Sequence, residues 1–380
     1  MGSYQDRRQK YVTIKTRELL QDLPPFIFDF FRGIEHTTSA NTRLAYAYDI
    51  RVYLNYMYTQ MPHLQSLDSI KDITLQDLER MTARDIECFL EYLSYYEKGN
   101  GDVEKAYDET SLSLEDNMTN EEEPEDVIHL KRPNFHQNSQ TGKARKLATI
   151  KTLYHYFYKQ ERITTNAPSI VDMPKIHEKP IIRLEVDEIA KLLDVVESGE
   201  QLTEKQKIYH EFTKKRDLAI IAILLGTGIR VSECVGINLE DIDFNYNGVK
   251  ITRKGGNETI IYFSTEVEKI LRDYLVERKN KPCKDMDNPL FLSLQNKRIS
   301  VRSVQLLVKK YSAHVTTLKK ITPHKLRSTY GTQLYQETGD IYLVADVLGH
   351  KDVNTTKRHY AQMDDARRKY AATIVKLREE

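Results

Sequence analysis

The stretch from Thr322 to Tyr360 combines an H-x-x-R motif, a Leu-Gly-His sequence and a tyrosine. His324 and Arg327 form the first motif, and His350 ends the second. Arginine keeps its charge and offers a planar fork of donors that suits two phosphate oxygens. Histidine can exchange a proton near neutral pH, and a tyrosine hydroxyl can act as a nucleophile. These residue types together fit a reaction at a phosphodiester, although each motif alone is common in proteins.

A helix is predicted to carry the H-x-x-R motif. Thr322 is a suitable N-cap, and Pro323 fits the first helical position because the backbone N–H that proline lacks is not needed there. His324 and Arg327 then lie three residues apart on one face of the helix. Since the N-terminus of a helix favours negative charge, this face is suited to an anion.

Two further helices are predicted after this one. The first runs from Ile341 to Leu348, with Asp340 as its N-cap and Gly349 ending it. The second is capped by Asn354 and carries Tyr360. His350 is therefore expected in the turn between the two helices.

A second arginine follows an apolar segment further upstream. Residues 218–230 read LAIIAILLGTGIR, and the first nine are apolar on every side, which predicts a buried helix. The Gly226-Thr227-Gly228 sequence can turn the chain so that Arg230 opens the next element. Glu233 follows three residues later. Residues 249–263 then predict two strands around a Gly-Gly turn, with Lys254 at that turn.

In this order, Arg230, Lys254, the H-x-x-R, the Leu-Gly-His and the tyrosine resemble the signature of the tyrosine recombinases. This integrase family includes the phage integrases and the Xer-type recombinases. Glu233 falls on the acidic position of the family's first arginine motif. In many members the tyrosine lies nine residues after the histidine of Leu-Gly-His. That position is His359 here, and Tyr360 is one residue further on.

The resemblance implies a covalent mechanism. Tyr360 would attack the phosphorus and form a 3′-phosphotyrosine with a free 5′-hydroxyl. A phenol has a pKa near 10, so it needs a base or a cationic surround, and His324 is the expected proton acceptor. Lys254 matches the family's general acid, which protonates the leaving oxygen. Because the covalent link conserves the bond energy, no ATP is needed.

Charge stabilisation is assigned to the remaining residues. Arg230 and Arg327 would bind the two nonbridging oxygens of the pentavalent transition state, and His350 would hydrogen-bond one of them. Glu233 would orient its neighbours. The motifs contain no carboxylate cluster suited to Mg²⁺, and the chain has no G-x-x-x-x-G-K-[ST] loop. We therefore expect catalysis with no metal and no cofactor.

The charge of the chain is distributed unevenly. The 380 residues have a net charge of +1, but residues 101–128 contain eleven acidic residues and one lysine, which gives −10. The remainder therefore has a net charge of +11, consistent with a polyanionic partner. The three cysteines form no C-x-x-C pair, which favours a reduced compartment without structural zinc. With no membrane-spanning run and no signal-peptide core, a cytoplasmic location is expected.

The predicted fold is mainly α. It combines an N-terminal helical core-binding domain of SAM-like type with an α+β catalytic domain that contains a small antiparallel sheet. The resemblance identifies this arrangement as the DNA-breaking-rejoining fold. The expected parts are an N-terminal segment 1–36, a core-binding domain 37–165 with an acidic, mobile insertion 98–138, a linker 166–182 and a catalytic domain 183–380. The last part contains a C-terminal helix 362–380, which can pack on its own domain; the resemblance implies that it docks on a neighbouring subunit instead.

Basic residues beside the predicted apolar stripes are candidates for DNA contact. They lie on two predicted helices of the first domain and in the segment 298–302 of the second. The candidates are Arg43, Arg51, Lys143, Arg145, Lys146, Lys151, Arg298 and Arg302.

The expected partner is double-stranded DNA with paired, inverted-repeat sites. The resemblance implies a homotetramer on DNA, with a monomer in the free state as an open possibility, and no membrane contact. Two alternatives remain open at this point. One is a type IB topoisomerase, which relaxes DNA with related chemistry, and the other is a DNA-binding clamp without catalysis. Chromosome-dimer resolution and mobile-element integration or transposition are not separated by the residues.

Overall fold

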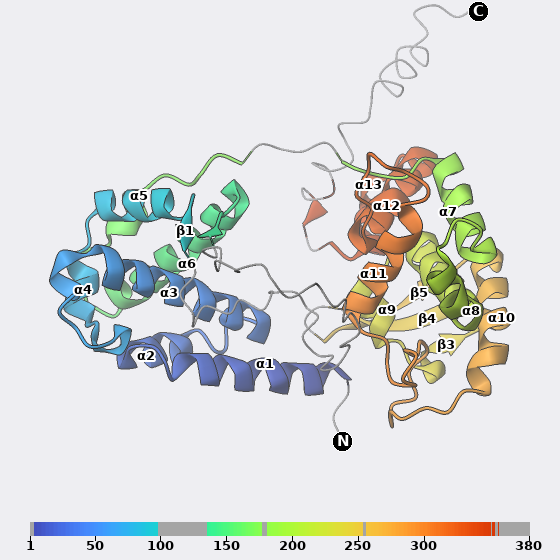
Figure 1. Cartoon of the computed structure of the whole chain (residues 1–380), viewed down its shortest axis with the longest axis horizontal. Coiled ribbons are helices and arrows are strands. Elements are labelled where there is room, and N and C mark those ends of the chain that lie inside the picture. The colour runs from blue at the N-terminus through green and yellow to red at the C-terminus, as the bar shows by residue number, and fades with distance from the viewer. Residues whose placement is uncertain are drawn as a thin grey trace, which may run out of the picture. The chain divides into compact units, whose positions relative to one another are not determined.

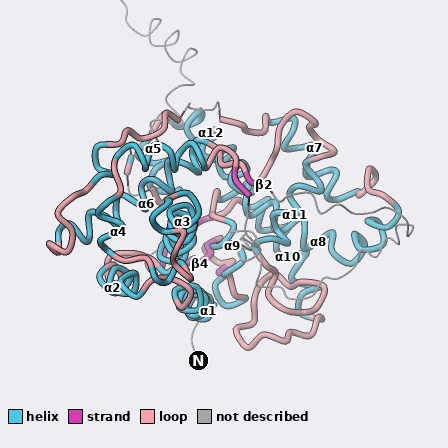
Figure 2. The backbone as a smooth tube through the Cα atoms, turned by 60° about the vertical axis from the view of Figure 1, so that its left-hand side comes forward, coloured by secondary structure: helices cyan, strands magenta, loops and turns pink. Residues whose placement is uncertain are grey.

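The computed structural model describes residues 4–97, 135–176, 181–253, 256–350, 352–353 and 356. Of these, the residues up to 176 form one unit and those from 181 onward form another. Figure 1 labels their elements, and Figure 2 shows that helices make up most of the described backbone while the strands are short. The prediction of a mainly α chain is therefore confirmed.

The first unit is built from helices and one short pair of strands. Strand β1 (Tyr96–Glu97) pairs antiparallel with β2 (Phe135–His136). Residues 98–134, which include most of the predicted acidic insertion, lie outside the described residues. The helical elements of this unit are α1 (Tyr4–Leu20), α2 (Pro25–Gly33), α3 (Ala40–Gln60), η1 (Pro62–Leu64), η2 (Ile70–Asp72), α4 (Leu75–Arg80), α5 (Ala83–Tyr92), α6 (Gln140–Lys159) and η3 (Ala167–Ile170).

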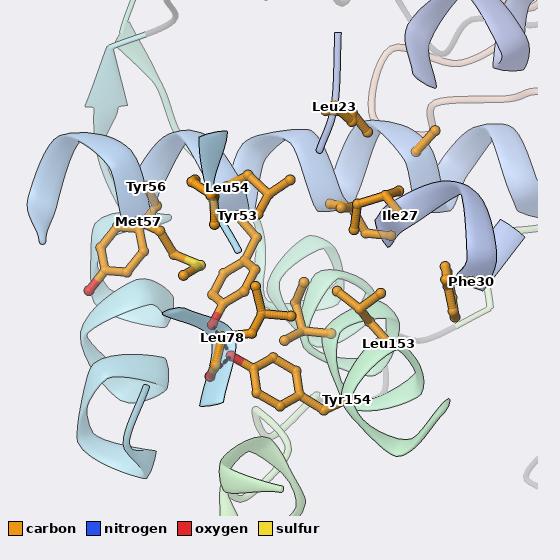
Figure 3. Packing of buried hydrophobic residues seen from close by; sticks show 14 of the residues in the cluster. Leu23, Ile27, Phe30, Tyr53, Leu54, Tyr56, Met57, Leu78, Leu153 and Tyr154 are labelled. Atoms are coloured by element: carbon orange, nitrogen blue, oxygen red, sulfur yellow. Dashed lines mark hydrogen bonds between the residues drawn. The ribbon is translucent and has the colours of Figure 1, made fainter. Parts of the chain in front are cut away.

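The core of the first unit lies between α3 and α6. Figure 3 shows Tyr53 of α3 and Tyr154 of α6 pointing toward one another across it. Their hydroxyls are 2.8 Å apart, and Tyr154 donates to the carbonyl of Leu78 at 2.9 Å. Tyr53 is therefore the donor in the bond between them. Burial raises the pKa of both phenols, so they serve as neutral hydrogen-bonding groups in the core.

The N-terminal helices share this core. Phe26, Ile27, Phe30 and Phe31 of α2 are buried in the same hydrophobic cluster as the apolar residues of α3 and α6. The predicted N-terminal segment 1–36 is thus, from residue 4 onward, packed on the unit that follows it. Its cluster of aromatic side chains is explained by that packing.

The predicted linker 166–182 also differs from the structure in its first part. Residues 167–170 form η3, which packs on α5 and α6. Pro168 and Val171 are buried, and Val171 belongs to the core of the first unit. Proline spacing suggested a connecting segment, but the apolar residues between the prolines hold its start against the unit.

The second unit contains the small sheet. Its three strands are antiparallel in the order β3-β4-β5, with Ile242 opposite Val249 and Lys250 opposite Ile260. In Figure 1, the orange α12 lies beside the green α8, against which α7 and α10 also pack. The elements are α7 (Val186–Ser198), α8 (Glu204–Thr227), α9 (Val231–Gly236), η4 (Leu239–Asp241), β3 (Ile242–Asp243), β4 (Gly248–Thr252), β5 (Glu258–Tyr262), α10 (Thr265–Lys279), α11 (Val301–Ser312), α12 (Pro323–Thr338) and α13 (Ile341–Leu348).

A buried carboxylate joins α8 to α11. Asp217 is 1% exposed and accepts hydrogen bonds from Thr213 at 3.2 Å and from the Tyr311 hydroxyl at 2.9 Å. Arg216 donates to its other oxygen at 2.7 and 3.0 Å, and the Lys310 ammonium lies 3.6 Å away. Burial lowers the pKa of Lys310, while the Asp217 charge opposes that shift. The two helices are therefore held together by a charged network that depends on one residue.

Replacing Asp217 with alanine is expected to destabilise the protein by about 3–5 kcal/mol, because buried cationic and hydroxyl donors lose their acceptor. Chemical denaturation of the full chain measures this loss. Asp187→Ala is the matched control, since Asp187 forms an exposed pair with Lys191 at 3.4 Å. That control should cost at most about 1 kcal/mol. Equal effects of the two substitutions would contradict the role assigned to Asp217.

Candidate active site

The apolar part of α8 ends at a glycine that other elements approach closely. Residues 219–224 are buried, as predicted from their uniform hydrophobicity. Gly228 follows the helix with φ of +63°, in the left-handed region that glycine adopts without a steric cost. A Cβ at Gly228 would collide with the Tyr330 ring and with the side chain of Leu348. Gly228 therefore lets the ends of α8 and α13 come together beside α12.

Arg230 is held by an acidic neighbour. It is the N-cap of α9, and its backbone N–H donates to the Glu233 carboxylate at 2.7 Å. Its Nη1 donates to the other oxygen of Glu233 at 2.8 Å. The Glu233 side chain is 4% exposed, while that of Arg230 is 36% exposed. Glu233 thus fixes the orientation of Arg230, and the guanidinium still reaches solvent.

Arg327 is buried and bridges two helix ends. Helix α12 begins at Pro323, as predicted, although the Thr322 side chain forms no capping hydrogen bond. Arg327 is 5% exposed, and its Nη1 donates to the Gly228 carbonyl at 2.6 Å. Its Nη2 donates to the carbonyl of Leu348. The guanidinium plane is therefore set by the C-terminal ends of α8 and α13.

Helix α13 runs from residue 341 to 348, with Asp340 accepting hydrogen bonds at its start and Gly349 in the left-handed region at its end. Both features match the prediction. Three consecutive carbonyls at its C-terminal end each accept a hydrogen bond from a different arginine. The pairs are Val347 with Arg253 at 2.9 Å, Leu348 with Arg327, and Gly349 with Arg230 at 3.4 Å.

The charges at this helix end do not cancel. Three guanidinium groups carry three positive charges, and Glu233 supplies one negative charge. Arg327 also binds the end of α8, and each of the two helix ends contributes about half a negative charge, so the surplus is about +1. A cluster of oriented guanidinium groups with a positive surplus is suited to bind the oxygens of a phosphate.

The predicted histidines lie on either side of Arg327 in the sequence. The His350 backbone N–H donates to Ala345, which places it directly after α13. Its Nδ1 lies 2.7 Å from the Thr356 hydroxyl, so that contact fixes the ring. His324 is exposed in the first turn of α12, three residues before the buried Arg327.

Two predicted catalytic residues cannot be placed. Lys254 and Tyr360 lie outside the described residues, as does Asn354. The strands on either side of the hairpin turn are described, with Thr252 opposite Glu258. Of the predicted catalytic set, the structure thus brings together Arg230, Arg327 and, through the turn after α13, His350.

One member of the arginine cluster was missed by the sequence interpretation. Arg253 directly follows β4 and immediately precedes Lys254. The signal available in the sequence was its position next to the hairpin lysine. Its contact with Val347 could not be predicted, because it depends on how the hairpin approaches α13.

Two of the predicted DNA contacts are buried, and for these the structure argues against the prediction. Lys146 is 2% exposed, and its ammonium lies 3.6 Å from the buried Asp49 and 3.2 Å from Asn138. The Arg298 side chain is 5% exposed and donates to the carbonyls of Val235 and Ile237. Both cations stabilise the fold because their partners lie inside it.

The other candidates differ in how exposed their side chains are. Arg145 pairs with Asp49 at 2.6 Å, yet its side chain is 47% exposed, and Arg302 is exposed on α11. The remaining side chains are half-buried. Arg43 donates to the carbonyls of Glu35 and Thr38, Lys143 to Ser94, and Lys151 to the carbonyls of Ser169 and Val171. Arg51 lies on α3.

Cys234 is fully buried, and burial raises the pKa of its thiol, as expected for a small core residue. Within the described ranges, no group of three or more His, Cys, Asp or Glu residues could hold a metal ion. Among the same residues, no helix has the length and apolar composition needed to span a membrane.

Similarity to known proteins identifies the family of this chain. The phage integrase family pattern matches residues 183–367, which contain the whole arginine cluster. Tyrosine recombinase XerC of Caldanaerobacter subterraneus subsp. tengcongensis is 30% identical, over 98% of this chain and 93% of its own length. Tyrosine recombinase XerS of Lactococcus lactis subsp. cremoris is 29% identical, over 90% of this chain and 95% of its own. The chain therefore belongs to the tyrosine recombinase family.

Solved structures of recombinases share the fold. The XerH site-specific recombinase bound to a palindromic difH substrate aligns with a TM-score of 0.59 and 18% identity, over 88% of this chain and 79% of that chain. The Tn1549 transposon integrase in complex with circular intermediate DNA aligns with a TM-score of 0.57 and 17% identity, over 90% of this chain and 97% of that chain. These likenesses confirm the predicted fold class.

Proposed function

We propose that this protein recombines DNA at specific sites by cutting and rejoining strands through a 3′-phosphotyrosyl intermediate. The observation that carries the proposal is the convergence of Arg230, Arg253 and Arg327 on the end of α13, directly before His350. Such a cluster can bind the nonbridging oxygens of a scissile phosphate. The family membership supports DNA as the source of that phosphate.

In the proposed reaction, Tyr360 attacks the phosphorus and His324 accepts the phenolic proton. Arg230 and Arg327 stabilise the charge that develops on the nonbridging oxygens. This kind of preorganised electrostatic stabilisation is commonly the largest contribution to catalysis. The Glu233 carboxylate supports it indirectly, because it keeps Arg230 in a fixed orientation.

The reaction is completed by two further groups. His350 hydrogen-bonds a nonbridging oxygen, and its ring is already held by Thr356. Lys254 protonates the departing 5′-oxygen. The 5′-hydroxyl of a second strand then attacks the phosphotyrosine and restores the backbone with a new partner. No external energy source enters this exchange.

The proposed substrate is double-stranded DNA with paired, inverted-repeat sites, and the proposed assembly on it is a homotetramer. The structural relative XerH is bound to a palindromic substrate, which supports a symmetric site. Strand exchange needs two cut sites in one complex, and this requirement supports an assembly of several subunits. The exposed Arg145 and Arg302 are proposed contacts with the DNA backbone.

The two alternatives receive less support. A type IB topoisomerase would use related chemistry on single sites, whereas the relatives that match over nearly the whole chain are recombinases. A clamp without catalysis would have no need for arginines oriented by Glu233 and by two helix ends. Site-specific recombination therefore fits both the cluster and the relatives.

Covalent trapping tests the proposal. The protein selects an inverted-repeat duplex from a random-sequence pool, and that duplex is prepared with a nick that lets the cleaved end diffuse away. In EDTA, we expect an adduct that survives SDS, because Tyr360 becomes joined to a 3′-phosphate. Peptide mapping identifies the modified residue. An intact duplex that stays tightly bound, with no adduct, would favour the clamp.

A paired-site assay separates the recombinase from the topoisomerase. Two labelled duplexes that carry the selected site should exchange strands and yield recombinant products. The control is relaxation of a supercoiled plasmid without the site. Relaxation of that plasmid, together with a failure to exchange strands between sites, would identify a topoisomerase instead.

A further inference from the structure

Arg253 belongs to the arginine cluster, and its place in the chain also joins the β4–β5 hairpin to α13. It follows the last residue of β4, and its backbone N–H donates to the Asn257 carbonyl at 2.8 Å. Its own carbonyl accepts from Gly256 at 3.1 Å, where Gly256 has φ of +85°. These bonds close the hairpin turn. Arg253 is thus fixed by its backbone at the start of the segment that contains Lys254.

The side chain of Arg253 leaves the hairpin and reaches α13. Its Nη2 donates to the Val347 carbonyl at 2.9 Å. Its guanidinium also lies directly over Gly349, because a Cβ on that glycine would overlap the guanidinium nitrogens and carbon. Gly349 has φ of +63°, so glycine is favoured there both by the backbone and by this contact. The side chain therefore connects the hairpin to α13.

This connection ends at the same helix terminus that orients Arg230 and Arg327. The carbonyls bound by these two arginines are Gly349 and Leu348, next to Val347 in the chain. Lys254 is joined to Arg253 by a peptide bond. A lysine can reach a defined leaving oxygen only if its backbone is held relative to the groups that bind the phosphate.

We propose that Arg253 is a positioning residue for the proposed general acid, Lys254, because it fixes the end of β4, to which the lysine is joined, on the end of α13. This inference rests on the proposed function. In the step concerned, the Tyr360 oxygen bonds to phosphorus as the bond from phosphorus to the 5′-oxygen breaks. The leaving oxygen takes a proton from the Lys254 ammonium, which becomes a neutral amine.

The test uses a substrate whose leaving group needs no proton. In a duplex with sulfur at the 5′-bridging position, the departing thiolate is stable near neutral pH, so general acid catalysis becomes dispensable. On ordinary DNA, Arg253→Ala should slow cleavage by about 10²-fold or more, in the range of a lost general acid. On the sulfur substrate, its rate should return to within a few-fold of the wild-type rate.

Three variants provide the comparison. Lys254→Ala should show the same loss and the same recovery as Arg253→Ala. Arg230→Ala should show a loss that sulfur does not restore, because it acts on the nonbridging oxygens. Arg253→Lys should recover part of the rate on ordinary DNA, since an ammonium can still donate to Val347.

Gly349→Ala keeps the test informative if Arg253→Ala does not fold. The added methyl group displaces the guanidinium, so this variant should also be slow on ordinary DNA and recover on the sulfur substrate. DNA binding and thermal unfolding of each variant are measured alongside the cleavage rates. A variant whose DNA affinity and unfolding temperature match those of the wild type reports on the chemical step alone.

Two results would overturn the inference and leave the proposed function intact. If Arg253→Ala cleaves ordinary DNA at the wild-type rate, the contact with α13 has no role in catalysis. If it is slow on both substrates, Arg253 binds the phosphate itself, with its Nε as a candidate donor because that atom is buried without a hydrogen-bond partner. A wild-type protein that cleaves neither substrate would instead remove the proposed function.

Discussion

Tyr360→Phe is expected to abolish the covalent adduct and strand exchange while DNA binding stays at the wild-type level. The substitution removes one oxygen atom and leaves the ring, so only the nucleophile is lost. Without this hydroxyl, no other group of the proposed site can form the phosphotyrosyl intermediate. Trapping on the nicked duplex measures the adduct, and a gel-shift titration measures binding.

The matched control is Tyr370→Phe, the same change at the other tyrosine that follows His350 in the sequence. It should leave both adduct and recombination intact. The comparison also settles the spacing, because Tyr360 lies ten residues after His350 instead of the nine found in many family members. An adduct that persists in Tyr360→Phe and disappears in Tyr370→Phe would move the nucleophile to Tyr370.

Arg327→Ala is expected to lower both activity and stability. The cleavage rate should fall by about 10³-fold, as when an enzyme loses a preorganised donor to a developing charge. The free energy of unfolding should fall by about 3 kcal/mol, because the carbonyls of Gly228 and Leu348 lose a buried, charged donor. Single-turnover cleavage well below the unfolding temperature separates the first effect from the second.

Arg327→Lys distinguishes charge from geometry. An ammonium keeps the charge but lacks the planar fork that reaches two carbonyls, so we expect activity to remain low. Arg272→Ala provides the control for stability, since the Arg272 side chain is 55% exposed, pairs with Glu268 on α10 and lies over the Phe244 ring. It should cost about 1 kcal/mol or less and leave cleavage unchanged. A wild-type cleavage rate in Arg327→Ala would place the reacting phosphate elsewhere.

Local sequence signals predicted the elements around the site well. The bounds of α13 follow from the Asp340 cap and from Gly349, and both features depend only on neighbouring residues. The start of α12 at Pro323 was predicted for a similar reason, although the Thr322 side chain does not cap it. The buried part of α8 was visible as an uninterrupted apolar run.

Tertiary relations were less accessible. A basic residue on an amphipathic helix looks the same whether it faces solvent or a buried acid on another helix. Lys146 and Arg145 are adjacent in the sequence, and Asp49 of α3 holds the first inside the fold while the second stays half exposed. Likewise, Arg298 became a structural residue because the carbonyls it binds are supplied by residues 235–237. Only the packing of the chain assigns these partners.

The end of α13 links activity to stability. The last carbonyls of any helix lack hydrogen-bond partners within the helix. Here three arginines of the proposed site donate to three of these carbonyls. A substrate that draws a guanidinium group away leaves the capped carbonyl without a hydrogen bond. This costs about 1–3 kcal/mol if the carbonyl stays buried. The affinity for a phosphate is therefore set by a competition with helix capping. Engineering that tightens these caps should make the protein more resistant to heat and a slower enzyme.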